Sequence, residues 1–94
     1  MSFTKLRDFY EAGHADAIGP LRAWYPTILQ SRWRGFADFW DEFPSADQVG
    51  ERAVFNIAGN KYRLVVRVDY VRHGVLVRFV GTHAEYDKID VGSI

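Results

Sequence analysis

The C-terminal part of the chain brings together four side chains that could take part in proton transfer. His83, Glu85, Tyr86 and Lys88 lie within one stretch of six residues. Histidine has an unperturbed pKa of about 6.5, so it is a common general acid or base near neutral pH. A phenol, with an ordinary pKa of about 10, needs neighbouring cations to act in the same way. A single histidine near a strand end is more often structural than catalytic, so the cluster alone is weak evidence.

The second half of the chain carries an excess of positive charge. Over the whole sequence, 12 Lys and Arg balance 12 Asp and Glu, and the net charge is zero. Residues 52–83 nevertheless contain a single acidic residue, Asp69. The six basic residues of the same stretch are Arg52, Lys61, Arg63, Arg67, Arg72 and Arg78. This asymmetry is typical of a surface that meets an anion, and it leads us to expect RNA.

The basic stretch also has the two-residue period of β-strands. We expect strands at 53–57, 61–70 and 75–82, with a two-residue turn at Gly59-Asn60 that has glycine first, as in type II′ hairpins. This turn pairs Ile57 with Tyr62 and Asn56 with Arg63. In the second hairpin, we expect Tyr70 to pair with Val75. Arg67 and Arg78 would then be direct cross-strand neighbours.

Alternation of side chains predicts one apolar and one polar face for this sheet. The apolar face is expected to hold Phe55, Ile57, Tyr62, Leu64, Val66, Val68, Tyr70, Val75, Val77 and Phe79. The polar face is expected to hold Asn56, Lys61, Arg63, Val65, Arg67, Asp69, Leu76, Arg78, Val80 and Thr82. Adjacent like charges destabilise a sheet, whereas the planar guanidinium group matches a phosphate, so the arginines favour an anion site. Strict alternation would send His83 to the apolar face unless the strand ends or bulges near Gly81, as we expect.

The first half of the chain has helical spacing instead. We expect a helix at 4–13, a second helix capped by Asp16 with a break or kink near Tyr25 because of Pro26, and a short third helix at 35–42. Residues 45–51 are expected to form a loop. The sequence therefore predicts a single α+β domain over residues 1–94, with N-terminal helices packed on a small antiparallel β-meander.

Composition excludes several kinds of protein. The chain has no cysteine, which rules out disulfide scaffolds, cysteine-based zinc sites and thiol catalysis. No apolar run approaches the roughly 20 residues that span a bilayer, and the first residues lack the apolar core of a signal peptide. We therefore expect no membrane partner and a cytoplasmic location.

Several segments resemble the HigB branch of the RelE-like toxins. The longest are VFNIAGNKYRLV at residues 54–65 and RFVGTHAEYDKI at residues 78–89. The segments GPLRAWY at 19–25 and FPSAD at 43–47 also match, so the resemblance covers about residues 6–89. Pro26 departs from the pattern, because relatives more usually continue there with charged helix formers.

The resemblance implies the toxin of a bacterial type II toxin–antitoxin pair with a RelE-like fold. Such toxins cut messenger RNA on the ribosome without a metal or cofactor, and a cognate HigA-like antitoxin neutralises them. In this chain it assigns charge stabilisation to Arg63 and Arg78, and proton transfer to His83 and Tyr86 without deciding which is acid or base. The side chains expected to contact RNA are Lys61, Arg67, Asn56, Asn60 and Lys88.

Two other functions use the same basic face. The first is a non-catalytic RNA-binding module, although the predicted register buries Tyr62 and Tyr70, which could otherwise stack on bases. The second is a protein-binding domain whose arginines meet an acidic partner. An antitoxin that covers the face would be such a partner, so this function is compatible with a toxin.

Overall fold

Helices precede an antiparallel sheet, as the sequence predicts. The computed structural model describes residues 3–94. In chain order the elements are α1 (Thr4–Glu11), η1 (Ala15–Ala17), α2 (Ile18–Gln30), η2 (Phe36–Asp41), β1 (Asp47–Val49), β2 (Arg52–Ile57), β3 (Tyr62–Asp69), β4 (Gly74–Thr82), α3 (His83–Tyr86) and η3 (Val91–Ser93). None of the helices in this part of the chain is long and apolar enough to cross a bilayer.

The sheet has four strands in the order β1-β2-β3-β4, and every neighbouring pair is antiparallel. The additional strand, β1, lies in residues 45–51, where we expected a loop, so that expectation is wrong. It is three residues long, and Val49 pairs with Arg52 across a tight turn. Gly50 takes φ +60° in this turn, a conformation that glycine adopts without strain.

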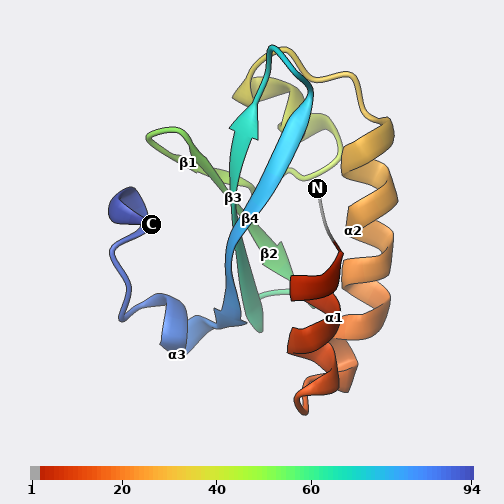
Figure 1. Cartoon of the computed structure of the whole chain (residues 1–94), viewed down its shortest axis with the longest axis vertical. Helices are drawn as coiled ribbons and strands as arrows, with labels where there is room; N and C mark the ends of the chain where they lie inside the picture. The colour runs from red at the N-terminus through yellow and green to blue at the C-terminus, as the bar shows by residue number, and fades with distance from the viewer. Residues whose placement is uncertain (1–2) are drawn as a thin grey trace.

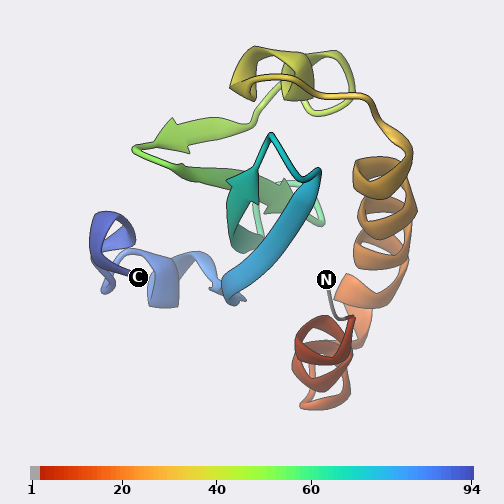
Figure 2. The same cartoon turned by 45° about the horizontal axis from the view of Figure 1, so that its top comes forward.

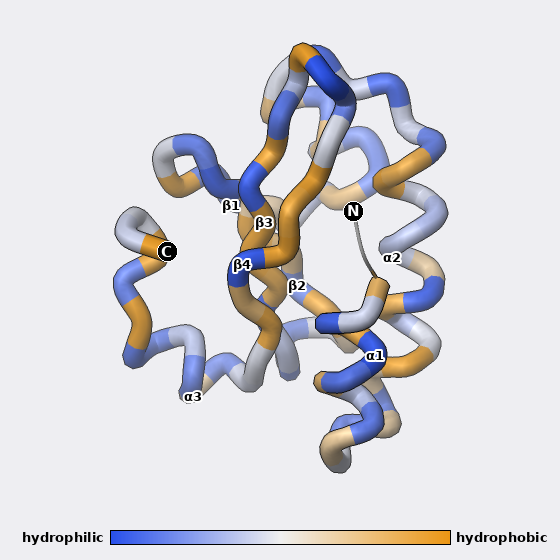
Figure 3. The backbone as a smooth tube through the Cα atoms, viewed as in Figure 1, coloured by the Kyte–Doolittle hydropathy of each residue, from blue (hydrophilic) through white to orange (hydrophobic). Residues whose placement is uncertain are grey.

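The sheet is covered on both sides. Helices α1 and α2 lie against one face, and the C-terminal residues from α3 onward lie against the other (Figures 1 and 2). We call these the helix face and the tail face. The main hydrophobic core fills the helix face, where the Phe55 ring makes edge contacts with Trp24, Phe39 and Phe43 at centroid distances of 5.5, 5.6 and 5.0 Å. Hydrophobic residues dominate β3 and β4 where they cross the middle of the molecule (Figure 3).

Helix α2 passes through Pro26 without interruption, so of the predicted break or kink near Tyr25 the break does not occur. Proline removes one N–H donor, but Pro26 lies on the exposed side of the helix, where water can reach the carbonyl that it leaves unpaired. On the opposite side Leu21, Trp24 and Ile28 are fully buried, and their packing holds the helix together. The predicted cap by Asp16 is also wrong: α2 has Ala17 at its N-cap and no side-chain cap.

The first predicted hairpin is confirmed. Ile57 pairs with Tyr62, and Asn56 with Arg63, as the Gly59-Asn60 turn requires. The amide of Lys61 donates to the carbonyl of Ala58 at 3.3 Å, and Gly59 takes φ +69°. Asn56 and Arg63 therefore share the tail face.

The second hairpin differs from the predicted register at its turn. Asp69 pairs with Gly74 and Val68 with Val75, so the predicted pairing of Tyr70 with Val75 is wrong. Farther from the turn, β4 also contains a β-bulge. Val65 pairs with Phe79 and Val66 with Val77, so Arg78 is an extra residue without a partner in β3. Arg67 lies opposite Leu76, and the prediction that Arg67 and Arg78 are cross-strand neighbours is wrong. A bulge shifts the alternation of all residues beyond it. We expected the alternation to break near Gly81, whereas it breaks at Arg78.

The bulge exchanges the faces of the residues that follow it. Val77 and Val80 both pack in the main core, so Arg78 and Phe79 between them project to the tail face. Our assignment of Phe79 to the apolar face and of Val80 to the polar face is therefore wrong. Beyond the bulge, Gly81 follows Phe79 on the tail face, and the chain reaches His83 from the same side.

The tail face carries its own hydrophobic cluster, although we expected this to be the polar face of the sheet. Val54, Val65 and Val91 are its buried members. The residues packed against them are Val49, Phe79, Tyr86, Ile89 and Ile94. The guanidinium group of Arg52 donates to the carbonyl of Ile94, with Nε at 2.7 Å. The C-terminal segment is thus packed onto the sheet.

This packing predicts that Val91→Ala weakens the fold. Val91 is 8% exposed, and removing its two methyl groups should lower the free energy of unfolding by about 1–2 kcal/mol. Urea unfolding of the purified protein measures this change. Ser93→Ala, an exposed position in the same segment, is the control and should leave stability unchanged. Equal stability of Val91→Ala and the wild type would show that the tail does not pack on the sheet in solution.

Candidate active site

Arg63 and His83 meet on the tail face, where β3 begins and β4 ends. Nη2 of Arg63 lies 3.0 Å from Nε2 of His83. The other ring nitrogen of His83, Nδ1, lies 3.2 Å from Oδ2 of Asp87. Because Arg63 pairs with Gly81 across the strands, the bulge at Arg78 is what brings His83 to the same face as Arg63. The structure therefore joins two of the predicted catalytic residues.

A short helix, α3, holds His83 in place. Thr82 caps it: the Thr82 hydroxyl accepts from the Glu85 amide at 3.2 Å, and Glu85 Oε1 accepts from the Thr82 amide at 2.8 Å. These hydrogen bonds, chiefly the one from the Thr82 amide, lower the pKa of Glu85 below its ordinary value of 4.5. The His83 amide also donates to the carbonyl of Lys61, at 3.2 Å. The position of His83 is thus tied to both β3 and the capping box.

Tyr86 and Arg78 lie on the same face as this pair. The guanidinium carbon of Arg63 is 5.1 Å from the centroid of the Tyr86 ring, a cation–π contact. The rings of His83 and Tyr86 are 6.4 Å apart. Arg78 is exposed, and among residues 3–94 it makes no ion pair with a carboxylate. Arg63, His83 and Tyr86 therefore meet at one end of the tail face, while Arg78 lies on the same face at the bulge in the middle of β4.

Two polar atoms beside the pair are buried and lack partners. They are Nε of Arg63 and Oδ1 of Asn56, on residues that face each other across β2 and β3. A buried polar group without a hydrogen bond is disfavoured by roughly 1–3 kcal/mol. The guanidinium group of Arg63 is therefore only partly satisfied in this arrangement, and it has no carboxylate partner.

Lys61, a predicted RNA contact, is bound to the helical side of the molecule. Its ammonium group pairs with the Asp16 carboxylate, which also accepts from the Tyr62 hydroxyl. These bonds, first that from Lys61, lower the pKa of Asp16, and the bond to Asp16 raises the pKa values of Lys61 and Tyr62. Asp16 thus neutralises Lys61 beside the site.

The remaining predicted RNA contacts are spread around the Arg63–His83 pair. Asn60 is exposed in the β2–β3 turn, and Lys88 is exposed just after α3. Arg67 is farther along β3, with Nη2 at 3.3 Å from Oε2 of Glu51, and it lies next to Arg52 across the strands. Together these positions do not form one continuous basic surface.

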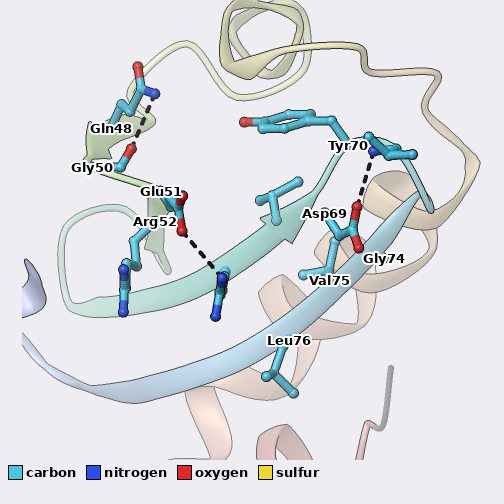
Figure 4. A pocket seen from close by; sticks show the side chains of 12 residues that line it. Gln48, Gly50, Glu51, Arg52, Asp69, Tyr70, Gly74, Val75 and Leu76 are labelled. Carbon is cyan, nitrogen blue, oxygen red and sulfur yellow. Dashed lines mark hydrogen bonds and ion pairs between the residues drawn. The ribbon is translucent and has the colours of Figure 1, made fainter. Parts of the chain in front are cut away.

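A depression lies at the opposite end of the tail face from His83. It has a volume of about 800 Å³ and lies between the β1–β2 hairpin and the β3–β4 hairpin (Figure 4). Arg52, Arg67, Tyr70 and Leu76 are among its lining residues, and the four predicted catalytic residues are not. The Arg63–His83 pair therefore lies outside this depression.

Two parts of this cluster were not predicted from the sequence. The first is the capping box, which has the recognisable pattern Thr82-x-x-Glu85 at the start of a helix. The second is Asp87, four residues after His83 and hence on the same side of a helical turn. The four-residue spacing of His83 and Asp87 indicates a contact only within a helix, and no helix was predicted there.

The close packing around Gly81 predicts that Gly81→Ala damages the site. A Cβ atom there would lie 2.7 Å from Cζ of Phe79 and 3.0 Å from Oε1 of Glu85. Either the Phe79 ring or the capping box must move, and overpacking of this kind typically lowers stability by about 1–3 kcal/mol. Urea unfolding should show this loss, while Gly92→Ala, whose nearest neighbour would be at 3.6 Å, should show little. A fully stable Gly81→Ala variant would contradict the described packing.

The capping box also predicts a pH dependence of stability. Because the pKa of Glu85 is lowered in the folded state, its carboxylate stabilises the protein above the ordinary value of 4.5. This contribution is lost as the pH falls below 4.5 and through the folded-state pKa. In urea unfolding at a series of pH values, the wild type should therefore lose stability in acid more steeply than Glu85→Gln. Parallel curves for the two proteins would argue against the cap.

A comparison with protein families supports the resemblance seen in the sequence. A search among curated proteins gave no match. A family model described as HigB_toxin, the RelE-like toxic component of a toxin-antitoxin system, matches residues 17–89. The match runs from η1 to the end of the segment after α3 and includes Arg63, Arg78, His83 and Tyr86. The chain therefore belongs to the HigB family of RelE-like toxins, and it is the toxin of a toxin–antitoxin system with an antitoxin as its partner.

Proposed function

We propose that this toxin is a metal-independent endoribonuclease that cuts messenger RNA on the ribosome. The observation that carries the proposal is the contact of Arg63 with His83 beside Tyr86, on a face that Arg78 shares. Family membership supports a nuclease in general terms. A ribosomal substrate places the protein in the bacterial cytoplasm.

These side chains match what cleavage of RNA without a metal requires. A 2′-hydroxyl must lose a proton, negative charge must be stabilised on the phosphorus, and the leaving 5′-oxygen must gain a proton. Arg63 and Arg78 supply permanent positive charge for the second requirement, because guanidinium groups stay protonated at cellular pH. His83 and Tyr86 supply the groups for proton transfer. Arg67, Asn56, Asn60, Lys61 and Lys88 would contact neighbouring parts of the RNA.

The position of the Arg63–His83 pair outside the depression and the small number of free basic groups support a role for the ribosome. The Arg63–His83 pair does not lie in the depression of the tail face, and Lys61 is neutralised by Asp16. Affinity for free RNA increases with the number of phosphate contacts, and few basic groups are available here. A messenger already held by the ribosome needs less binding energy from the toxin.

Arg63→Ala should remove most cleavage and growth inhibition. Loss of one charge-stabilising group typically lowers the rate by about 10²–10³-fold. The measurement is incubation of the purified variant with translating ribosomes, followed by mapping of the new 5′ ends. Expression without the antitoxin should in parallel permit growth.

Arg72→Ala is the matched control for this experiment. Arg72 is also a basic residue of the sheet region, but it lies in the β3–β4 turn with its side chain 88% exposed. This variant should cleave like the wild type, and circular dichroism should show all three proteins folded. A folded Arg63→Ala variant that cleaves at the wild-type rate would refute the assignment. Binding of the wild type to ribosomes without cleavage would favour a non-catalytic module instead.

A further inference from the structure

We propose that Asp87 is a positioning residue that holds His83 in one neutral tautomer and thereby makes His83 the general base. The inference rests on the proposed ribonuclease function, and it assigns a role that the side-chain types alone leave open. It depends on the hydrogen bonds at the two ring nitrogens of His83, which are made to partners of opposite character.

The partner at Nε2 can only donate. A guanidinium group has five N–H donors, no acceptor and a permanent charge. Since Nη2 of Arg63 lies 3.0 Å from Nε2 of His83, the hydrogen bond requires a lone pair on Nε2. The imidazole is therefore neutral at this nitrogen, and its single proton is on Nδ1.

The partner at Nδ1 is the carboxylate of Asp87. In its ionised form a carboxylate has no proton to donate and can only accept a hydrogen bond. Oδ2 of Asp87 lies 3.2 Å from Nδ1, at the distance of a weak hydrogen bond, and accepts a hydrogen bond from the Nδ1–H group. The two contacts select the same tautomer, so Asp87, His83 and Arg63 form one directed chain of hydrogen bonds. A histidine held in this way has its basic nitrogen turned toward Arg63.

The same arrangement explains why the base is not exposed before substrate arrives. Arg63 covers the lone pair on Nε2, although its own Nε is buried without a partner. A phosphodiester group offers two anionic oxygens to a guanidinium fork. When the scissile phosphate binds, Arg63 can turn toward it and leave Nε2 free to accept a proton from the substrate.

The chemical step then balances as follows. The 2′-hydroxyl gives its proton to Nε2 of His83, and the 2′-oxygen forms a bond to phosphorus. The bond between phosphorus and the 5′-oxygen breaks, and that oxygen takes a proton from Tyr86 or from water. The products are a 2′,3′-cyclic phosphate and a free 5′-hydroxyl. His83 is left as an imidazolium, whose Nδ1 proton remains bonded to Asp87.

The other charged or titratable groups around His83 interact with partners other than its ring nitrogens. Glu85 holds the capping box, and its carboxylate is influenced by the nearby His14 and Lys88. The Tyr86 ring lies 6.4 Å from the imidazole and against Arg63. Lys61 contributes its backbone carbonyl here, while its ammonium group is paired with Asp16. Asp87 is thus the one carboxylate in residues 3–94 that hydrogen-bonds to the His83 ring.

The tautomer can be measured directly in the free protein. Two-bond ¹H–¹⁵N spectra distinguish an imidazole protonated at Nδ1 from one protonated at Nε2, and the chain has 3 histidines, of which His83→Gln identifies the relevant signal. We expect His83 protonated at Nδ1 in the wild type and in Arg63→Ala, where Asp87 alone selects the tautomer. In the double variant Arg63→Ala/Asp87→Asn we expect a mixture of tautomers, because an amide can either donate or accept. A wild-type His83 protonated at Nε2, or a single unchanged tautomer in Arg63→Ala/Asp87→Asn, would overturn the proposal.

Cleavage on ribosomes gives the second readout. Asp87→Asn should lower the maximal cleavage rate by about tenfold or more while the concentration of ribosomes needed for half-maximal rate stays the same. Asp87→Glu should recover part of the rate, because a carboxylate can again accept from Nδ1. Asp90→Asn is the control: Asp90 caps η3 and does not contact His83, and asparagine can also accept from the Gly92 amide. A wild-type rate in Asp87→Asn would overturn the positioning role.

The two proposals can fail separately. If the wild type cleaves messages but its His83 is protonated at Nε2, the ribonuclease function stands and the positioning role of Asp87 is refuted. If the wild type cleaves no message, the ribonuclease function is refuted, whatever tautomer the spectra show.

Discussion

The β-bulge at Arg78 determines which side chains can meet on the tail face. Side chains in a strand alternate between the two faces of a sheet, so one extra residue reverses the assignment of everything beyond it. Without it, His83 would follow the alternation of Val75 and Val77 into the main core. With the bulge, Arg78 and Phe79 both point to the tail face, and His83 reaches Arg63. The geometry of the site is therefore a consequence of strand register.

The tail face combines packing and chemistry because the C-terminal segment serves both. Val91 and Ile89 pack on Val54 and Val65, and the same segment starts with the helix that carries His83. The apolar cluster separates the end of the sheet with Arg63 from the end with Arg52 and Arg67. In a chain of 94 residues, a second cluster also buries apolar surface that a single core would leave exposed.

The distribution of charge limits what the site can do by itself. Of the basic groups in residues 52–83, Lys61, Arg67 and Arg72 have carboxylate partners, and Arg52 is bonded to the carbonyl of Ile94. Arg63 and Arg78 remain without a carboxylate. Two cations without a carboxylate partner suit contact with a phosphate group better than binding of a long stretch of RNA, in agreement with the proposed substrate, a messenger held by the ribosome.

The sequence by itself determined the class of the fold and the first hairpin, and it predicted the residues that we propose for the chemistry. These features are local: the Gly59-Asn60 turn fixes the register of β2 and β3, and the motifs around Arg63 and His83 are continuous in the chain. Tertiary structure decided the rest. The position of the bulge, the passage of α2 through Pro26, the pairing of Lys61 with Asp16 and the cover of the tail face each depend on contacts between distant segments. An alternating sequence pattern cannot show where a strand contains one extra residue. The position of the bulge depends on which side chains of β4 fit the clusters on the two faces of the sheet.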